Sequence, residues 1–328
     1  MATLEYKHER VEVREGETVL DALLRKGADI PHSCRSGVCR SCTMVASAGE
    51  LPEAALVGLR EVERRQGMFL ACLCRPSGDL ELRDVGEQAT IAARIVEVAH
   101  LSASVVRLRV QPEAAFEYEA GQYLSLRRAD GLARSYSLAS VPSEPWLELH
   151  LRRMPEGRMS GWAYDEARPG MAVALRGPYG SCCYAADQPD APMLMIAVGT
   201  GLAPLWGVIR QALASGHVGP ITLIQAAATP EGLYMREDLH ELARAHPQLH
   251  IRTCVLRGGG GDIEEGAVDA LALDHLRRAE QAGEVARQLA YVCGDAALVQ
   301  RVRRGLFLSG MSTRRIFVDA FVTAPPVV

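Results

Sequence analysis

The sequence has no hydrophobic run long enough to cross a membrane. No apolar stretch approaches the roughly 18 residues that a transmembrane helix requires, and the first ten residues, Met1–Arg10, are too polar for a signal peptide. An excess of one charge is also lacking, because 36 basic and 40 acidic residues leave a net charge of −4. Such a balance does not indicate a nucleic acid as partner. We therefore expect a soluble cytoplasmic protein.

Residues for hydrolytic catalysis are also missing. The nine histidines form no ligand pair with supporting carboxylates, and neither a Ser–His–Asp arrangement nor a pair of catalytic carboxylates can be assembled. No internal repeat is present. Hydrophobic residues nevertheless make up 48% of the 328 residues, which is enough for real cores and for two or three domains.

Nine cysteines are present, a number that indicates metal or redox use in a cytoplasmic chain. Cys34, Cys39 and Cys42 lie in the run CRSGVCRSC, and Cys72 follows in LACLCRP. The spacing C-x4-C-x2-C…C is that of plant-type [2Fe–2S] proteins, which carry one electron at a time. A zinc site is the alternative, although zinc sites usually show two short C-x2-C pairs. Cys74 is an alternative to Cys72 as the fourth ligand.

The patterns of apolar residues divide the chain into three expected domains, residues 1–86, 90–187 and 190–328. The first combines alternating residues with a helix over Thr18–Lys26, capped by Thr18, which suits a small β-grasp fold. The second is rich in short strands and indicates an antiparallel barrel or sandwich. In the third, strands and helices alternate from Met193 onward, which indicates a parallel α/β sheet. Polar stretches at Asp84–Gln88 and Asp187–Ala191 separate the three.

The β-rich segment contains the run Arg134-Ser135-Tyr136-Ser137-Leu138. This R-x-Y-S-L run resembles the flavin motif of the ferredoxin–NADP reductase superfamily. The resemblance implies that Arg134 pairs with the flavin pyrophosphate, where a guanidinium fork suits phosphate oxygens. It also implies that Tyr136 stacks on the isoalloxazine ring and that Ser137 hydrogen-bonds near the flavin N5 atom.

Other short runs of this segment resemble the same superfamily. Gly157-Arg158-Met159-Ser160 precedes a helical pattern and is similar to a second phosphate loop, in which backbone N–H groups and a Ser hydroxyl contact the pyrophosphate. Gly177-Pro178-Tyr179-Gly180 is similar to the G-P-x-G turn at the end of the flavin domain, and Gly121-Gln122-Tyr123 to a strand opening. Leu138-Ala139-Ser140-Val141-Pro142 resembles the branch that uses FAD.

A glycine-rich turn follows the apolar strand Met193–Val198. Its sequence, Gly199-Thr200-Gly201-Leu202-Ala203-Pro204, opens a helix, where backbone N–H groups suit a pyrophosphate. The turn resembles G-T-G-x-A-P of the same superfamily. Cys293-Gly294-Asp295 resembles the C-G motif beside the nicotinamide, with Asp295 where Pro is more usual. Near the C-terminus, Asp319-Ala320-Phe321 resembles the family ending whose aromatic residue approaches the flavin, although Phe321 also suits a core position.

The expected nucleotide is NADH. After the strand Ile221–Gln225 the superfamily often carries Gly-Ala-Arg, whereas this chain has Ala226-Ala227-Ala228-Thr229. No cation stands immediately there for the 2′-phosphate of NADPH. Arg236 is a cation that could still reach it, so NADPH stays open as the alternative.

Together the motifs cover nearly the whole chain and resemble the reductase components of bacterial aromatic-ring-hydroxylating dioxygenases, of the naphthalene dioxygenase reductase type. That resemblance places the fourth cluster ligand at Cys72. It implies a β-grasp ferredoxin domain, an antiparallel β-barrel FAD domain and a Rossmann-like parallel α/β nucleotide domain. It further implies hydride transfer from NADH to FAD, release of single electrons to the cluster, and Ser137, Thr200 and Cys293 lining the contact.

The expected partner is an electron-acceptor protein, either a Rieske-type ferredoxin or a terminal oxygenase. Residues 1–86 carry 12 basic and 14 acidic side chains, so the segment is no strongly acidic carrier. Arg35, Arg40 and Arg75 flank the cluster cysteines and predict a basic rim that docks an acidic partner. We expect a monomer. The alternatives are the same relay serving a non-haem monooxygenase or a deoxysugar dehydrase, and a non-catalytic ferredoxin-like carrier.

Overall fold

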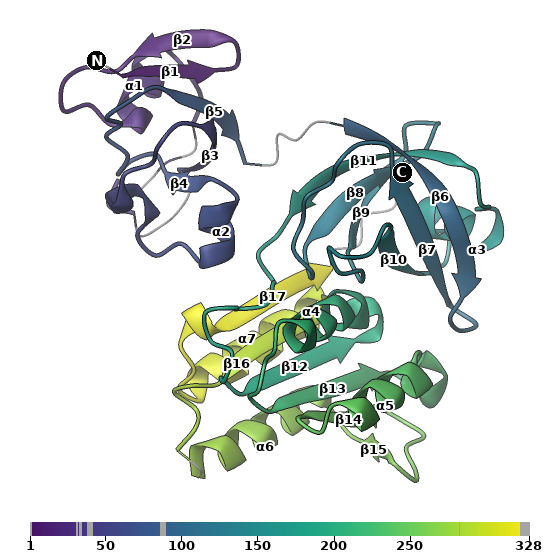
Figure 1. Cartoon of the computed structure of the whole chain (residues 1–328). Helices are drawn as coiled ribbons and strands as arrows, with labels where there is room; N and C mark the ends of the chain where they lie inside the picture. Colours follow the sequence, from purple (N-terminus) through teal and green to yellow (C-terminus); the bar gives the residue numbers. More distant parts are fainter. Residues whose placement is uncertain are drawn as a thin grey trace. The chain divides into compact units, whose positions relative to one another are not determined.

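The computed structural model describes residues 2–30, 32, 35–37, 42–85, 90–281 and 283–321. Cys34, Cys39, Arg40 and residues 86–88 of the predicted linker Asp84–Gln88 lie outside these residues. The chain divides into two compact units, Met1–Gln88 and Ala89–Val328, and each is described by itself (Figure 1).

The first unit is a mixed sheet with helix α1 packed against it. The strand order is β2-β1-β5-β3-β4, with β1 and β5 parallel and the other neighbours antiparallel, which is the predicted β-grasp arrangement. Its elements are β1 Thr3–Tyr6, β2 Glu9–Glu12, α1 Val19–Arg25, β3 Thr43–Ala48, a 3-10 turn Glu53–Leu56, α2 Glu61–Arg65, β4 Met68–Leu70 and β5 Leu80–Asp84.

The helix α1 begins where the sequence predicts. The backbone at Thr18 is extended, and its side chain accepts a hydrogen bond from the backbone N–H of Asp21 at 3.2 Å, which satisfies one of the free donors at a helix N-terminus. The apolar positions Val19, Leu20, Ala22 and Leu23 are buried against the sheet. Packing of this face therefore holds a helix of seven residues that would be too short to persist alone.

The second unit begins with an antiparallel sheet in the order β10-β7-β6-β11-β8-β9. Its two outer strands are joined by an isolated bridge between Leu138 and Leu149 and by a 2.8 Å hydrogen bond from Ala139 N–H to the Glu148 carbonyl. The sheet is thus closed, and it is a barrel rather than a sandwich. Its elements are β6 Thr90–His100, β7 Val105–Pro112, β8 Tyr123–Arg127, β9 Ala133–Ser137, β10 Leu147–Arg152, α3 Arg158–Asp165 and β11 Ala172–Tyr179.

The rest of this unit is a parallel sheet in the order β15-β14-β13-β12-β16-β17 with helices on both faces. Helices α4 and α5 pack on one face of the sheet, and α6 and α7 on the other. The elements are β12 Met193–Val198, a 3-10 turn Gly199–Gly201, α4 Leu202–Ala214, β13 Ile221–Ala227, a 3-10 turn Pro230–Gly232, α5 Arg236–Ala245, β14 Leu249–Val255, β15 Ile263–Glu265, α6 Val268–Gln281, β16 Leu289–Asp295, α7 Ala296–Leu308, a 3-10 turn Thr313–Arg315 and β17 Ile316–Phe321.

Two of these elements were not predicted. The edge strand β15 has only three residues, too few for a recognisable alternation. The helix α6 does carry a signal, because its buried residues Val268, Ala272, Leu276 and Ala279 recur at helical spacing. The predicted series of strands and helices left the segment after the glycines at 258–261 unassigned.

Buried polar side chains join the barrel to the parallel sheet within the second unit. Glu148 on β10 contacts His150 Nε2 at 3.1 Å and accepts from Arg109 Nε at 2.8 Å. Burial opposes ionisation of Glu148, but the bonds from His150 and Arg109 outweigh it and lower its pKa to about 2. Burial also lowers the pKa of His150. A neutral imidazole with its proton on Nε2 therefore donates to Glu148 and accepts at Nδ1 from the Tyr234 hydroxyl, 3.0 Å away.

Replacing Tyr234 by Phe tests this contact. The change keeps the ring but leaves the buried Nδ1 atom of His150 without its donor, so we expect the free energy of unfolding to fall by about 1–3 kcal/mol. Urea unfolding followed by circular dichroism measures it. The matched control is Tyr164→Phe, because the Tyr164 hydroxyl makes only a long 3.4 Å bond to the Ser102 carbonyl. Equal losses in both variants would contradict the role given to Tyr234.

Candidate functional site

The strand order of the parallel sheet locates a binding crevice. From β12 the chain continues outward through β13, β14 and β15, and then returns to the other side of β12 to form β16 and β17. Ligands of open α/β sheets bind outside the carboxyl ends of the strands at such a reversal. Two glycine-containing segments meet there, Gly199–Pro204, which follows β12, and Cys293–Asp295, which forms the end of β16.

These two segments touch through glycine. A Cβ atom on Gly201 would overlap the carbonyl oxygen of Cys293, and one on Gly294 would lie 2.6 Å from the Val198 carbonyl. Gly199 has a φ of +54° and nothing within 4 Å of its Cβ position, so this part of the turn faces open space. Thr200 is half-buried, whereas Ala203 and Pro204 are buried in α4. An open glycine turn at a helix N-terminus fits a pyrophosphate.

Asp295 has a structural reason to differ from the proline that is usual in the family. It precedes α7, and its carboxylate accepts a hydrogen bond from the Leu298 N–H at 3.0 Å. Asp is among the best N-cap residues. Asp295 is therefore the N-cap residue of α7.

The flavin motif lies on β9 of the barrel. Ser137 and Leu138 are buried, Arg134 and Tyr136 are half-buried, and Ser135 is exposed. Burial raises the pKa of Tyr136, so the phenol stays neutral. The guanidinium of Arg134 donates to the carbonyl of its own neighbour Ala133 at 2.7 Å, and a phosphate would have to replace or share that local bond.

The second phosphate loop ends at the N-terminus of α3. A Cβ atom on Gly157 would overlap the hydroxyl oxygen of Ser160, so glycine is required. That hydroxyl accepts from Met154 N–H at 3.1 Å and donates to the Gly157 carbonyl at 3.3 Å, which shapes the loop. Arg158 is exposed, but the Met159 side chain is buried in the barrel core. Only the backbone of Met159 can therefore reach a ligand.

The barrel and the parallel sheet meet at a carboxylate that the sequence analysis did not assign. Asp319 on β17 accepts a 2.6 Å hydrogen bond from the hydroxyl of Ser137. Burial raises the pKa of Asp319 to about 6, although the bond from Ser137 works in the opposite direction. An acidic residue inside the apolar run Ile316–Phe321 was the available signal, because such a residue in a core strand must have a partner.

The Cys293 thiol lies beside this carboxylate. Burial raises the pKa of the Cys293 thiol, so it is protonated, and its sulfur lies 3.6 Å from that of Cys182. Residue 293 on β16 pairs with residue 319 on β17. The structure thus brings Ser137, Cys293 and Asp319 together from three strands, with Thr200 on the adjoining loop. Phe321 is half-buried at the end of β17, where it pairs with Asp295.

Two of the four predicted cluster ligands lie in the first unit's described residues. Strands β3 and β4 pair Thr43 with Leu70, and Ala71 N–H donates to the Cys42 carbonyl at 3.1 Å, so Cys42 and Cys72 stand at the same end of this pair. A Cβ on Gly37 would lie 2.6 Å from a methyl group of Leu73, so Gly37 lies against the segment that carries Cys72. The residues therefore fit a cluster bound between the two.

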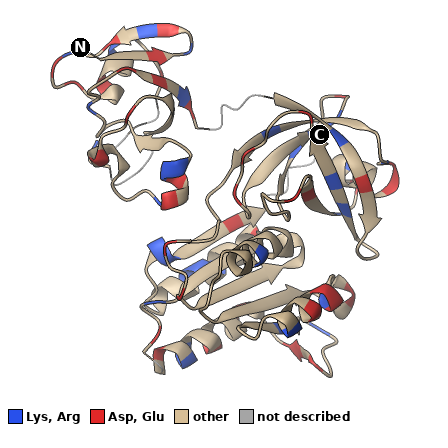
Figure 2. Cartoon of the chain, viewed as in Figure 1, with Lys and Arg blue, Asp and Glu red and all other residues tan. Residues whose placement is uncertain are grey.

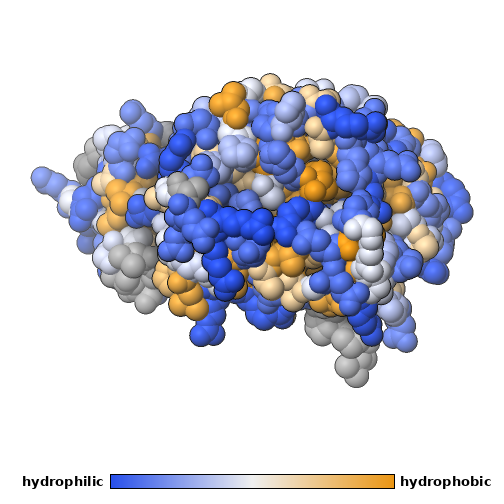
Figure 3. Space-filling view, turned by 90° about the horizontal axis from the view of Figure 1, so that it is seen from below, coloured by the Kyte–Doolittle hydropathy of each residue, from blue (hydrophilic) through white to orange (hydrophobic). Residues whose placement is uncertain are grey.

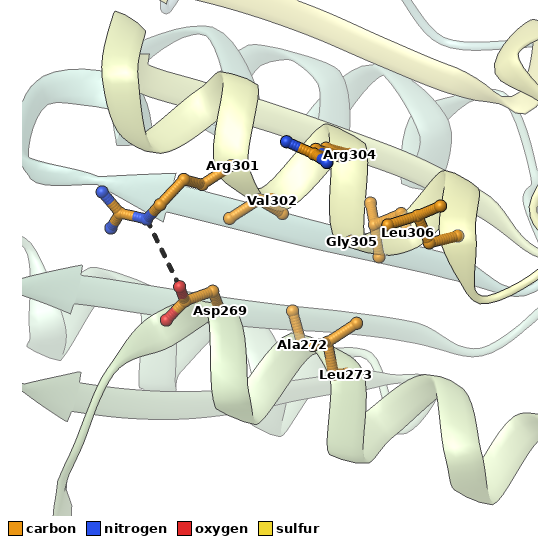
Figure 4. A pocket seen from close by; sticks show the side chains of 9 residues that line it. Asp269, Ala272, Leu273, Arg301, Val302, Arg304, Gly305 and Leu306 are labelled. Carbon is orange, nitrogen blue, oxygen red and sulfur yellow. Dashed lines mark hydrogen bonds and ion pairs between the residues drawn. The ribbon is translucent and has the colours of Figure 1, made fainter.

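A cavity of about 230 Å³ lies elsewhere, between α6 and α7 (Figure 4). Asp269, Leu273, Arg301 and Gly305 are among its lining residues, and Asp269 contacts Arg301 Nε at 3.4 Å. No residue of either glycine loop lines it, so it is separate from the site.

Comparison with protein-family models matches all three parts of the chain. Residues 2–77 match a 2Fe-2S iron-sulfur cluster binding domain, residues 92–184 an oxidoreductase FAD-binding domain and residues 195–304 an oxidoreductase NAD-binding domain. The ferredoxin–NAD(P)+ reductase component of the naphthalene 1,2-dioxygenase system of Pseudomonas putida is 33% identical, over 93% of this chain and 94% of that protein. This chain belongs to the family of ferredoxin–NAD(P)+ reductase components.

Other members of the family serve different oxygenases. The reductase component of phenol 2-monooxygenase from Pseudomonas sp. (strain CF600) is 31% identical over 98% of this chain and 94% of that protein. The crystal structure of an Amycolatopsis cytochrome P450 reductase has a TM-score of 0.66 and 30% identity, covering 98% of this chain and 99% of that one. A ferredoxin reductase in carbazole 1,9a-dioxygenase, 20% identical with a TM-score of 0.65, shows the same fold.

This ferredoxin–NAD(P)+ reductase component is therefore an oxidoreductase that uses NAD(P)H, FAD and a [2Fe–2S] cluster, and that passes electrons to an acceptor protein. The predicted identity, fold class and cofactors are confirmed. None of the helices in the described part of the chain combines the length and the apolar character needed to cross a bilayer.

Asp319→Asn tests the carboxylate at the contact of the two sheets. An ionised Asp319 fixes Ser137 as a donor, and protonation below pH about 6 removes that constraint. We expect the rate of flavin reduction by NADH to fall as pH drops through this value in the parent protein. In the variant the rate should be lower by about tenfold above this pH and nearly independent of pH. Stopped-flow flavin absorbance on both sides of the transition measures it.

Asp319→Glu is the control, because it keeps a carboxylate and should retain the pH transition. A transition that persists unchanged in Asp319→Asn would show that another group titrates.

Proposed function

We propose that this reductase transfers electrons from NADH, through FAD and the [2Fe–2S] cluster, to a Rieske-type ferredoxin or a terminal oxygenase of an aromatic-ring dioxygenase system. It would act in aromatic hydrocarbon catabolism, as a monomer in the cytoplasm, where NADH is formed. The observation that carries this proposal is the meeting of Ser137, Cys293 and Asp319 at the reversal point of a parallel sheet. The flavin motif on β9 and the nucleotide-side end of β16 thereby come together within one chain.

The roles of the site residues follow from this placement. FAD, when bound, supplies the exchange between a two-electron donor and one-electron acceptors. Ser137 donates to Asp319, so the lone pairs of its oxygen are free to accept from an N–H group placed against β9. Cys293, as a neutral thiol, and Thr200 limit the space on the nucleotide side. Because no side chain needs to act as a base, catalysis consists of holding donor and acceptor in contact.

The other predicted binding residues fill supporting roles in the proposal. Arg134 and the Gly157–Ser160 loop bind the flavin pyrophosphate, Tyr136 and Phe321 contact its ring system, and Gly199–Pro204 binds the nucleotide pyrophosphate. Cys34, Cys39, Cys42 and Cys72 hold the cluster, and Cys74 is left as a core residue, being fully buried. The proposed domains are residues 1–86, 90–187 and 190–328. In support of a monomer, the face in Figure 3 shows its hydrophobic residues in small patches interrupted by hydrophilic ones.

The relay is tested by rapid mixing of the purified protein with NADH under anaerobic conditions. The flavin absorbance should bleach first and the cluster absorbance after it, because electrons leave the flavin one at a time. A protein without flavin bands, or one whose bands do not respond to NADH, would be the ferredoxin-like carrier instead. Turnover with purified dioxygenase components and with monooxygenase components then separates the two acceptor classes, since reductases of both kinds resemble this chain.

The docking of the acceptor is tested at Arg35. Its guanidinium is 2.7 Å from Asp21 but half exposed. An exposed ion pair of this kind contributes little and is weakened by salt, so the guanidinium can also interact with a carboxylate of the acceptor. Arg35→Glu should slow reduction of an acidic acceptor about tenfold at low salt, with the difference shrinking as salt is added. The control is Arg10→Glu, on the strand β2 at the opposite edge of the sheet from β4. Equal rates of acceptor reduction for the parent and Arg35→Glu with the natural acceptor would contradict the proposal that a basic rim docks the acceptor.

A further inference from the structure

An ion pair lies beside the part of the sheet where the adenosine end of the nucleotide is expected. Arg236 is the first residue of α5, and its Nη2 atom is 2.6 Å from Oδ2 of Asp262, which directly precedes β15. From the glycine loop after β12 the adenosine ribose reaches the end of the neighbouring strand β13. The sequence identifies Arg236 as the cation that could take a 2′-phosphate there.

Both members of the pair are held in place by buried groups. The carbonyl of Tyr234, two residues before Arg236, accepts from the buried amide of Gln225 on β13 at 2.7 Å. The carbonyl of Asp262 accepts from Thr253 Oγ1 on β14 at 3.1 Å. The Arg236 side chain is 32% exposed and that of Asp262 is 65% exposed. The pair is therefore anchored through its backbone while the carboxylate faces solvent.

The connections after β13 and β14 run together, so the pair is near the predicted ribose position. Leu256 N–H donates to the Ala227 carbonyl and Arg257 N–H to the Ala228 carbonyl, both at 3.2 Å. Residues 226–229, which lack a cation, thus lie against the segment that leads to Asp262. A 2′-phosphate or 2′-hydroxyl bound at the end of β13 would therefore lie near both the β13–α5 connection and the β14–β15 connection.

Acidic side chains outnumber basic ones around this position, where Arg257 is an exposed cation after β14 and His240 Nε2 lies 4.0 Å from Asp262 Oδ2. Glu231, Glu237 and Asp238 belong to the β13–α5 connection and the first turn of α5, and all three are exposed. Figure 2 shows acidic segments on both α5 and β15. Hydrogen bonding to Arg236 lowers the pKa of Asp262, so the pair stays ionised. Binding a phosphate dianion here would require a free guanidinium fork, and Asp262 occupies one arm of it.

We propose that Asp262 is a specificity-determining residue, which excludes NADPH by engaging Arg236 and by repelling the 2′-phosphate. NADH carries a 2′-hydroxyl, which needs no cation. This inference rests on the proposed function, in which the crevice at the reversal point of the sheet binds a nicotinamide nucleotide. The Arg236–Asp262 pair explains why the protein would prefer NADH although an arginine lies near the expected position of the adenosine ribose.

Asp262→Asn is the direct test. The change frees the guanidinium and removes one negative charge, so the ratio of kcat/KM for NADPH to kcat/KM for NADH should rise about tenfold. The affinity for adenosine 2′,5′-bisphosphate relative to AMP, measured by calorimetry on the holoenzyme, should rise by a similar factor. This second measurement reports the adenosine end alone and does not depend on turnover.

Arg236→Gln and the double variant Arg236→Gln/Asp262→Asn complete a double-mutant cycle. If the gain passes through Arg236, the double variant Arg236→Gln/Asp262→Asn should lose most of it, whereas a purely structural effect of residue 262 would survive. The control is Glu264→Gln, which removes a carboxylate paired with Arg252 at 2.8 Å on the neighbouring strands, and it should leave both ratios unchanged.

An unchanged ratio in Asp262→Asn, or a gain of equal size in Glu264→Gln, would overturn the role of Asp262 while leaving NADH oxidation by the parent protein intact. A parent protein that neither oxidises NADH nor binds AMP would overturn the proposed function itself, and this inference with it.

Discussion

The hydrogen bond between Ser137 and Asp319 joins residues 182 positions apart in the chain. Ser137 ends a strand of the barrel, and Asp319 lies in the last strand of the parallel sheet. The bond can form only if both sheets are complete and correctly placed, so it depends on the whole second unit. In return it places an ionisable group against the buried hydroxyl of Ser137 in the flavin motif.

Buried and partly buried polar contacts maintain this placement. Besides the Glu148–His150–Tyr234 chain, Arg210 on α4 donates to Glu144 at 2.8 Å and to the Ala139 carbonyl at 2.6 Å. Such groups would destabilise the interface if their partners were displaced, because an unpaired buried charge or donor is costly. The observed arrangement of the barrel against the parallel sheet is therefore favoured over shifted arrangements, in which these groups would lose their partners.

Local patterns in the sequence predicted much of this molecule. Thr18 and the apolar residues after it specify α1, since the cap and the spacing both act within one or two turns of helix. The turn at Gly199–Gly201 could be predicted in the same way. By contrast, Asp319 could not be assigned a role, because its significance lies in a partner from another sheet. Asp295 showed a similar limit: its departure from proline was visible, but its function as an N-cap required the start of α7.

By itself the sequence determined the three cofactor classes, the order of the domains and the strand-and-helix pattern, since short motifs and periodicity are local properties of the chain. Only the tertiary structure decided which of those residues meet. It brought Cys293 beside Asp319, paired Arg236 with Asp262 and turned the Met159 side chain into the core. The physical reason is that burial, pairing and charge balance depend on neighbours that folding supplies from distant strands, and no spacing along the chain records them.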